Sequence, residues 1–158
     1  MPTVNNVTRF LDSRKVFYET FEYPPEKLSA LDVALLLDVE PDSVFKTIVV
    51  TRDRPKKPLL VLVPGSAAVA LKLLASALGE KKVYLPTEHE AEKLTGLQAG
   101  GISPLALLNK SFQVVIDRSA NNHSHIYISG GQRGLSIKLS AGDLQRLTNA
   151  RFELVCTT

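Results

Sequence analysis

Features of secreted and membrane-bound proteins are scarce in this sequence. Its 158 residues contain one cysteine, Cys156, so no disulfide can form within the chain, and a reducing cytosol is the favoured compartment. No apolar run approaches the ~18 residues that a transmembrane helix needs, and residues 1–7 lack an apolar signal core. We therefore expect a cytoplasmic protein that does not contact a membrane.

Signatures of common hydrolytic chemistry are absent as well. The three histidines, His89, His123 and His125, belong to no HExxH pattern, and there is no CxxC pair, so we expect neither a built-in metal site nor a cofactor. The sequence has no GxSxG nucleophile elbow, no papain-like surroundings for its cysteine and no GxxxxGKS/T loop. Metal-dependent hydrolysis and attack by an enzymic serine or cysteine therefore have little support.

The overall composition is that of an ordinary globular protein, with 44% hydrophobic and 22% charged residues. A chain of this length can bury an adequate core, and we expect a single domain that spans residues 1–158. The formal net charge of +3 and the pI near 9.0 permit an anionic partner without requiring one.

Hydrophobic periodicity predicts a mixture of helices and strands. Helices are expected over residues 4–11, 29–37, 71–78, 87–94 and 140–147, with Thr3 and Ser29 capping the first two and Gly79 and Gly96 ending the third and fourth. Runs rich in β-branched, aromatic and other apolar residues predict strands over residues 16–23, 44–50, 59–63, 83–85, 112–117, 125–128, 135–139 and 152–155. Strands in close succession among helices favour an α+β fold with a mixed or antiparallel sheet over a doubly wound fold.

Two glycine-rich loops are the clearest candidates for a binding site. Residues 100–104 read GGISP, and residues 129–134 read SGGQRG. Because glycine allows a positive φ and a close backbone approach, such loops can present main-chain N–H groups to a carbonyl or phosphate oxygen. Each loop alone could be a tight connection, but two loops of similar chemistry favour a site. A side chain added at Gly101 would then be expected to fill the space that the ligand needs.

Two charged residues have both a structural and a functional interpretation. Lys46 interrupts the apolar strand 44–50, where it occupies either the solvent face or the edge of a cleft, and in a cleft an ammonium acts more strongly than in water. Arg133 is either solvated or a clamp for a phosphate. The basic run 52–57 is expected to be a solvated hairpin loop, with a sequence-blind, salt-dependent contact to an RNA backbone as the alternative.

Three segments together resemble a known family. Residues 44–47 (VFKT), residues 95–104 with the GGISP loop, and residues 126–135 (IYISGGQRGL) are similar in order and spacing to the YbaK/EbsC-type deacylases. These are free-standing relatives of the editing insertion domain of bacterial prolyl-tRNA synthetase, and the resemblance covers nearly the whole chain. It implies a single compact α+β domain with a mixed, largely antiparallel sheet and flanking helices.

The same resemblance implies an activity, partners and a set of site residues. The activity is removal of a mischarged amino acid from tRNA, most typically cysteine from Cys-tRNA(Pro), with tRNA(Pro) and prolyl-tRNA synthetase as implied partners. The implied catalytic residues are Lys46, Gly101 and Ser103. Around them, the implied substrate-binding residues are Gly100, Ile102 and Pro104 for the aminoacyl carbonyl and terminal ribose, and Ser129, Gly130, Gly131 and Arg133 for the opposite wall. In the cysteine-selective members the thiolate of the substrate attacks its own ester, which fits a sequence without an obvious enzymic nucleophile.

One position departs from the cysteine-selective pattern. That pattern has an acidic residue two positions after Gly134, where this chain has Ser136. Two alternatives therefore stay open: a deacylase for another small amino acid, such as alanine on Ala-tRNA(Pro), and a non-catalytic module that binds tRNA or a synthetase. The presence of both Lys46 and the GGISP loop favours the enzyme. The sequence does not indicate an oligomeric state.

Overall fold

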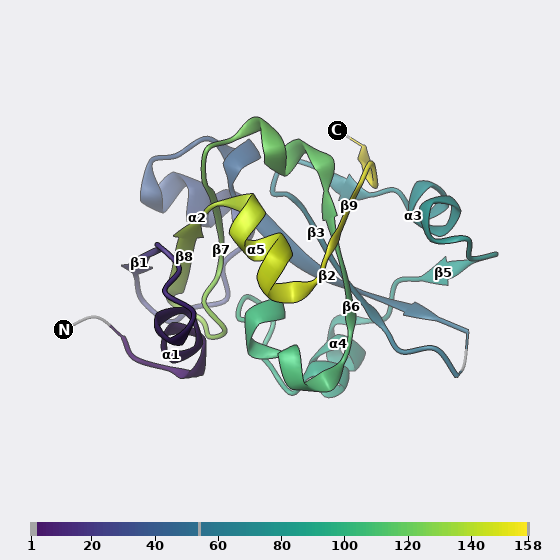
Figure 1. Cartoon of the computed structure of the whole chain (residues 1–158), viewed down its shortest axis with the longest axis horizontal. Coiled ribbons are helices and arrows are strands. Elements are labelled where there is room, and N and C mark those ends of the chain that lie inside the picture. The colour runs from purple at the N-terminus through teal and green to yellow at the C-terminus, as the bar shows by residue number, and fades with distance from the viewer. Residues whose placement is uncertain (1–2, 54, 158) are drawn as a thin grey trace.

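A five-stranded mixed sheet forms the centre of the computed structural model, which describes residues 3–53 and 55–157 (Figure 1). Its strand order is β5 (Val83–Tyr84), β2 (Phe45–Arg52), β3 (Leu59–Pro64), β6 (Gln113–Asp117) and β9 (Arg151–Glu153). β2 is antiparallel to both of its neighbours, whereas β3, β6 and β9 run parallel to one another. The carboxyl ends of the three parallel strands therefore lie at the same edge of the sheet as the beginning of β2.

A second, antiparallel sheet lies against the beginning of β2. It consists of β1 (Glu19–Glu22), β8 (Leu135–Leu139) and β7 (Ile126–Ser129), in that order. A parallel bridge between Val44 and Tyr127 joins β7 to the main sheet. This bridge brings the end of β7, where the second glycine-rich loop begins, close to the strand that carries the VFKT segment.

Five helices cover the sheets: α1 (Asn6–Ser13), α2 (Ala30–Leu37), α3 (Leu71–Leu78), α4 (Glu88–Thr95) and α5 (Ala141–Thr148). Figure 1 shows α1 and α5 on one side of the central strands and α3 on the other. Four of the five begin at a residue whose side chain accepts a hydrogen bond from the first turn, and the exception is α3. These caps fix the residue at which each of the four helices begins, although each helix is only eight residues long.

Among the described residues the core consists of three clusters, and the central strand β3 separates the two larger ones. Leu60 and Leu62 face the larger cluster, which contains side chains of α1 and α5, whereas Val61 and Val63 face the cluster beneath α3. Successive side chains of a strand point to opposite faces of the sheet, so a continuous apolar run is expected wherever both faces are covered. The run over residues 59–63 is therefore explained by its position between two helical layers.

The predicted α+β class with a mixed sheet is confirmed. Of the seven pairings between strands of the described residues, five are antiparallel, so the sheets are largely antiparallel as expected. Two short strands, β4 (Ala68–Val69) and β10 (Cys156–Thr157), were not predicted and pair with each other. Among the described residues, no helix has both the length and the apolar character needed to cross a bilayer.

Some predicted boundaries differ from the structure. The first helix is capped by Asn5 rather than Thr3, because the Asn5 side chain accepts from the main-chain N–H of Thr8. The strand expected over residues 16–23 is limited to Glu19–Glu22, which is the stretch that β8 pairs with. The basic run 52–57 lies at the β2–β3 hairpin as predicted, with Arg54 outside the described residues. Arg52 is not solvated as expected, because it ends β2 and its side chain is only 12% exposed.

Candidate active site

A cavity of about 550 Å³ lies along the open edge of β2. β5 pairs only with Thr51 and Arg52, so among the described residues no strand covers the preceding part of that edge. The cavity wall is completed by parts of α2, the turn before α4, the first glycine-rich loop and the ends of β7 and β8. Its volume lies within the usual range for small-ligand sites.

Lys46 belongs to the wall of this cavity. Its side chain is half-buried, and its Nζ lies 3.4 Å from the main-chain oxygen of Gly65. Within residues 3–53 and 55–157, no carboxylate lies at ion-pair distance from Lys46. A positive charge in a partly enclosed site acts more strongly than one in water. The structure thus places Lys46 at a cleft, not on a plain solvent-exposed face.

The first glycine-rich loop contributes part of the cavity wall. Gly100, at φ +87°, and Ile102 both line the cavity. Gly101 faces another way: a Cβ added there would lie 3.0 Å from the Cα of Gln132 and 3.1 Å from the main-chain nitrogen of Arg133. A side chain at Gly101 would therefore collide with the second glycine-rich loop rather than enter the cavity, contrary to the expectation from the sequence.

The remaining residues of the GGISP loop are buried behind the cavity. Ser103 is 0% exposed, and its hydroxyl accepts a hydrogen bond from the main-chain N–H of Leu105 at 3.2 Å. This hydroxyl caps a short 3₁₀ helix, Pro104–Ala106. Neither Ser103 nor Pro104 belongs to the cavity wall in this conformation. Their observed contacts hold the loop in shape.

The second glycine-rich loop reaches the cavity through Ser129. The Ser129 hydroxyl accepts a hydrogen bond from the main-chain N–H of Gly131 at 3.2 Å. Gly130 and Gly131 lie outside the cavity wall and are closely packed: added Cβ atoms would lie 2.5 Å from Leu135 and 2.9 Å from Val7. The glycines of this loop therefore permit close packing against β8 and α1.

The two loops are held together by side-chain contacts. The Nε of Arg133 donates to the main-chain oxygen of Ala99 at 2.7 Å, so this guanidinium ties the second loop to the first. Asn5, which sequence analysis did not single out, donates from Nδ2 to the main-chain oxygen of Gly130 and to Oε1 of Gln132, both at 3.0 Å. A signal for Asn5 was available, since asparagine three residues before Thr8 is a helix-capping pattern.

A pair of hydroxyls forms another part of the cavity wall. The Tyr23 hydroxyl and the Ser136 hydroxyl are 2.7 Å apart, and both residues line the cavity. Burial raises the pKa of Tyr23, although the hydrogen bond with Ser136 opposes that effect. Tyr23 was not predicted as a site residue, because the contact between β1 and β8 that brings it to Ser136 joins residues more than a hundred positions apart.

The single thiol of the chain lies outside the cavity wall and is unreactive. Burial, together with the neighbouring carboxylate of Asp117, raises the pKa of Cys156 to about 11. Since the thiolate is the nucleophilic form, a thiol with this pKa is almost fully protonated near neutral pH. Cys156 is therefore no candidate for an enzymic nucleophile.

The described residues also contain no pairing that would activate another nucleophile. None of the three histidines lines the cavity, and the one acidic residue in its wall, Glu88, contacts Lys27. In residues 3–53 and 55–157, no three side chains among His, Cys, Asp and Glu gather in a metal-binding arrangement. The cavity therefore offers the positive charge of Lys46, main-chain groups and hydroxyls in a wall that is otherwise apolar except for Glu88, which is paired with Lys27.

The cavity is bounded by the VFKT strand and a glycine-rich loop, two of the segments on which the family resemblance rests. The family model of the aminoacyl-tRNA editing domain matches residues 24–147, which include β2, both loops and β8. The chain therefore belongs to the aminoacyl-tRNA editing domain family. The recognition made from the three sequence segments is thereby confirmed.

Individual relatives agree with this assignment. The chain is 34% identical over 154 residues to EbsC of Enterococcus faecalis, a candidate deacylase of Cys-tRNA(Pro) and Cys-tRNA(Cys), with 96% of this chain and 93% of EbsC covered. It is 23% identical over 147 residues to the prolyl-tRNA editing protein ProX of Acetoanaerobium sticklandii, with 89% and 87% covered. A crystal structure of a candidate trans-editing enzyme for prolyl-tRNA synthetase superimposes with a TM-score of 0.81 at 20% identity, covering 99% of this chain and all of the other, and it supports the fold.

Proposed function

We propose that residues 1–158 form a trans-editing deacylase that removes cysteine from Cys-tRNA(Pro) in the cytoplasm. The observation that carries this proposal is a cavity with Lys46 in its wall. The described residues of that wall include no nucleophilic side chain paired with a histidine or a free carboxylate as general base. The name of EbsC, which is 34% identical to this chain, supports cysteine as the amino acid and tRNA(Pro) as a carrier.

Four of the five hydroxyl-bearing residues in the described cavity wall are already engaged in structure, and the exception is Thr47, whose buried hydroxyl has no hydrogen-bond partner. Ser29 caps α2 by accepting from the main-chain N–H of Asp32, and Ser129 accepts from the N–H of Gly131. Ser136 shares its hydroxyl with Tyr23. A hydroxyl needs an adjacent general base to become a good nucleophile, and no imidazole among the described residues lines this cavity. A cysteine ester is different because it brings a thiol of its own.

The reaction that we propose is attack of the substrate thiolate on its own ester carbonyl. A bond forms between the sulfur and the carbonyl carbon, and the ester C–O bond breaks. The terminal ribose leaves with the proton that the thiol lost, and a four-membered cysteine thiolactone remains, which water then opens to free cysteine. Lys46 stabilises the negative charge that develops on the carbonyl oxygen, assisted by main-chain groups of Gly100 and Ile102.

Gly101, Ser103 and Pro104 take a positioning role in this proposal, together with Gly130, Gly131 and Arg133. Their contacts fix the loop on which Gly100 and Ile102 reach the cavity. Gly100, Ile102 and Ser129 contact the aminoacyl group or the terminal ribose. A mechanism based on orientation needs such a rigid support, because a misplacement of about 1 Å can cost ~100-fold in rate.

The test compares esters of cysteine, serine and alanine on tRNA(Pro). We expect cysteine to be released at least ~100-fold faster than serine, because a serine hydroxyl is protonated and weakly nucleophilic near neutral pH. Lys46→Ala should lower kcat by ~100-fold or more without a change in Tm, and Lys46→Arg should be nearly as poor, because a guanidinium is larger and directs its donors differently. Lys72→Ala, on the exposed side of α3, is the matched control for loss of one lysine.

Three outcomes would contradict the proposal. Faster release of alanine than of cysteine would identify a deacylase for another small amino acid, in keeping with Ser136 at the position where an acidic residue was expected. Binding of tRNA(Pro) without release of any amino acid would identify a non-catalytic module. Wild-type rates for Lys46→Ala would remove Lys46 from the mechanism.

A further inference from the structure

A second concave region, which we call the basic hollow, lies beside the active-site cavity. It has a volume of about 530 Å³ and lies between the β2–β3 hairpin, the segment after the GGISP loop, the beginning of β6 and the end of α5. The charged residues among its described lining are Arg52, Lys56 and Lys57, all of them basic. Hydrogen-bonding side chains, including Gln113 and Asn149, line it too.

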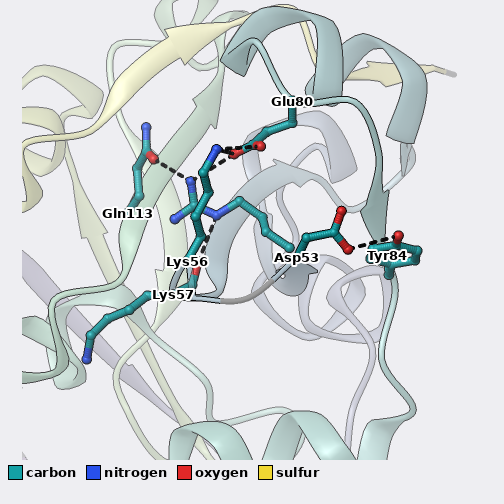
Figure 2. A network of polar contacts seen from close by, with 7 residues as sticks. Asp53, Lys56, Lys57, Glu80, Tyr84 and Gln113 are labelled. Atoms are coloured by element: carbon teal, nitrogen blue, oxygen red, sulfur yellow. Dashed lines mark hydrogen bonds and ion pairs between the residues drawn. The ribbon is translucent and has the colours of Figure 1, made fainter.

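A polar network holds the hairpin turn at this hollow in a fixed shape (Figure 2). The Nε of Arg52 donates to the main-chain oxygen of Lys57 at 2.8 Å, and its Nη1 lies 3.3 Å from Oε1 of Gln113 and 3.4 Å from Oε2 of Glu80. Lys56 binds both carboxylate oxygens of Glu80, at 2.8 and 2.9 Å. Lys56, and to a smaller extent Arg52, hold the pKa of Glu80 below its ordinary value.

Glu80 thus offsets one of the charges, and Lys57 remains without a carboxylate. The Nζ of Lys57 lies 3.2 Å from the main-chain oxygen of Lys110, whose own side chain adds another positive charge nearby. Within the described ranges, neither Lys57 nor Lys110 has an acidic side chain at ion-pair distance. Figure 2 shows the Lys57 side chain pointing away from Glu80. A surplus of positive charge therefore faces the hollow.

The basic hollow and the cavity share a wall. Pro104 lines the hollow, whereas Gly100 and Ile102 of the same loop line the cavity. Val49 and Leu60, which are cross-strand neighbours in β2 and β3, lie in the cavity and the hollow respectively. Pro104 follows Gly100 by four residues, which span at most ~14 Å. The two sites are therefore close enough for one polymer to reach both.

We propose that the basic hollow binds backbone phosphates of the RNA whose 3′ end occupies the cavity. This proposal rests on the proposed function. Lys57 makes the principal phosphate contact, Lys56 and Lys110 support it, and Arg52 positions the turn. Two observations favour RNA over an acidic protein. The basic hollow adjoins the active-site cavity, which holds the 3′ end of an RNA in the proposed function. Lys, Gln, Ser and Asn side chains are also common donors to phosphate oxygens.

The test measures binding of uncharged tRNA(Pro) as a function of salt concentration. Loss of one phosphate contact should make the slope of log K against log salt shallower by about one. Lys57→Glu removes this contact and adds a negative charge, so the ratio of the wild-type to the Lys57→Glu affinity should shrink at least about fourfold between 50 and 200 mM salt. In the deacylation assay the same variant should raise KM. Lys72→Ala is the control and should bind like wild type, because Lys72 lies on the exposed side of α3 and does not line the basic hollow.

The outcomes separate this proposal from the proposed function. Uncharged tRNA has no ester, so a slope change for Lys57→Glu stands even if no amino acid is ever released. Lys46→Ala should abolish release while keeping the wild-type slope. Lys57→Glu with the affinity and slope of wild type would overturn the assignment of the basic hollow to RNA. An equal loss for Lys57→Glu and Lys72→Ala would overturn it also, since it would show diffuse attraction to the whole surface.

Discussion

Two adjacent glycines of the GGISP loop are expected to resist substitution for different reasons. Gly101 is limited by space: a Cβ would lie 3.0–3.1 Å from Cα and C of Gln132 and from N of Arg133, all main-chain atoms that cannot rotate away. Gly100 is limited by conformation: its φ is +87°, yet the nearest atoms to an added Cβ are 3.7 Å away. Alanine at either position is therefore destabilising, but only one of the two variants forces the loops apart.

The magnitudes follow from these geometries. Overpacking costs typically ~1–3 kcal/mol, and we expect Gly101→Ala to lie in the upper half of that range because both contacting segments are backbone. Gly100→Ala should cost ~1–2 kcal/mol for the left-handed conformation alone. Asparagine tolerates positive φ better than alanine, so Gly100→Asn should recover part of the loss, whereas Gly101→Asn should be no better than Gly101→Ala.

Urea unfolding and thermal melting of the four variants measure these differences. For a chain of this size, 1 kcal/mol corresponds to a shift in Tm of ~2–4 °C, so a loss of ~2–3 kcal/mol in Gly101→Ala should lower the Tm by ~4–12 °C. The decisive observation is that asparagine is more stable than alanine at position 100 but not at position 101. A Gly101→Ala variant within about 0.5 kcal/mol of wild type would refute the close approach of the two loops, and equal behaviour of asparagine at both positions would refute the separation of causes.

Two further predictions concern Cys156 and Asp117, the carboxylate that lies beside the C-terminal segment. Because the pKa of Cys156 is raised from 9.0 to about 11, its native thiol should react with a disulfide reagent at pH 8 about 100-fold more slowly than in urea, and equal rates would contradict this. Burial raises the pKa of Asp117, but hydrogen bonds from Ser119 and Val155 outweigh it and the net pKa lies below 3.8. The carboxylate then stabilises the fold above pH ~4 and loses this effect as the pH falls through its lower native pKa. Asp117→Asn should accordingly be less stable than wild type at pH 7, with the difference shrinking by pH 3; a difference that stays constant would show that this charge is not involved.

Much of the fold could be predicted because its signals are local. The helix over residues 71–78 and the strand over residues 135–139 have the predicted bounds. A positive-φ glycine ends the helix, and the strand lies between a glycine turn and Ser140, the cap of α5. What could not be predicted depends on distant partners. The strand over residues 16–23 is shorter because β8 pairs with only four of its residues, and β4 forms only because β10 lies beside it. No periodicity over two residues can signal such a pair.

Sequence analysis predicted which segments contribute to the site better than it predicted which of their residues line the cavity. Lys46, Gly100, Ile102 and Ser129 do line one cavity, although they come from three separate segments. Tyr23 joins them through a contact that no local pattern encodes. The other predicted residues lie behind the cavity wall, because the motif marks the positions where two loops pack as much as the positions where a ligand fits.

The glycine pattern is best understood as a requirement of the contact between the loops. If the two glycine-rich loops formed opposite walls of the cavity, their glycines would face the ligand and a gap would separate the backbones. Instead Gly101 lies against the backbone of Gln132, and Arg133 donates to the main-chain oxygen of Ala99. The two loops thus form one packed unit. Asn5, which caps α1, adds a hydrogen bond from its Nδ2 to the main-chain oxygen of Gly130. Rigid placement of Gly100 and Ile102 follows from this contact, and an enzyme that only orients its substrate depends on that rigidity.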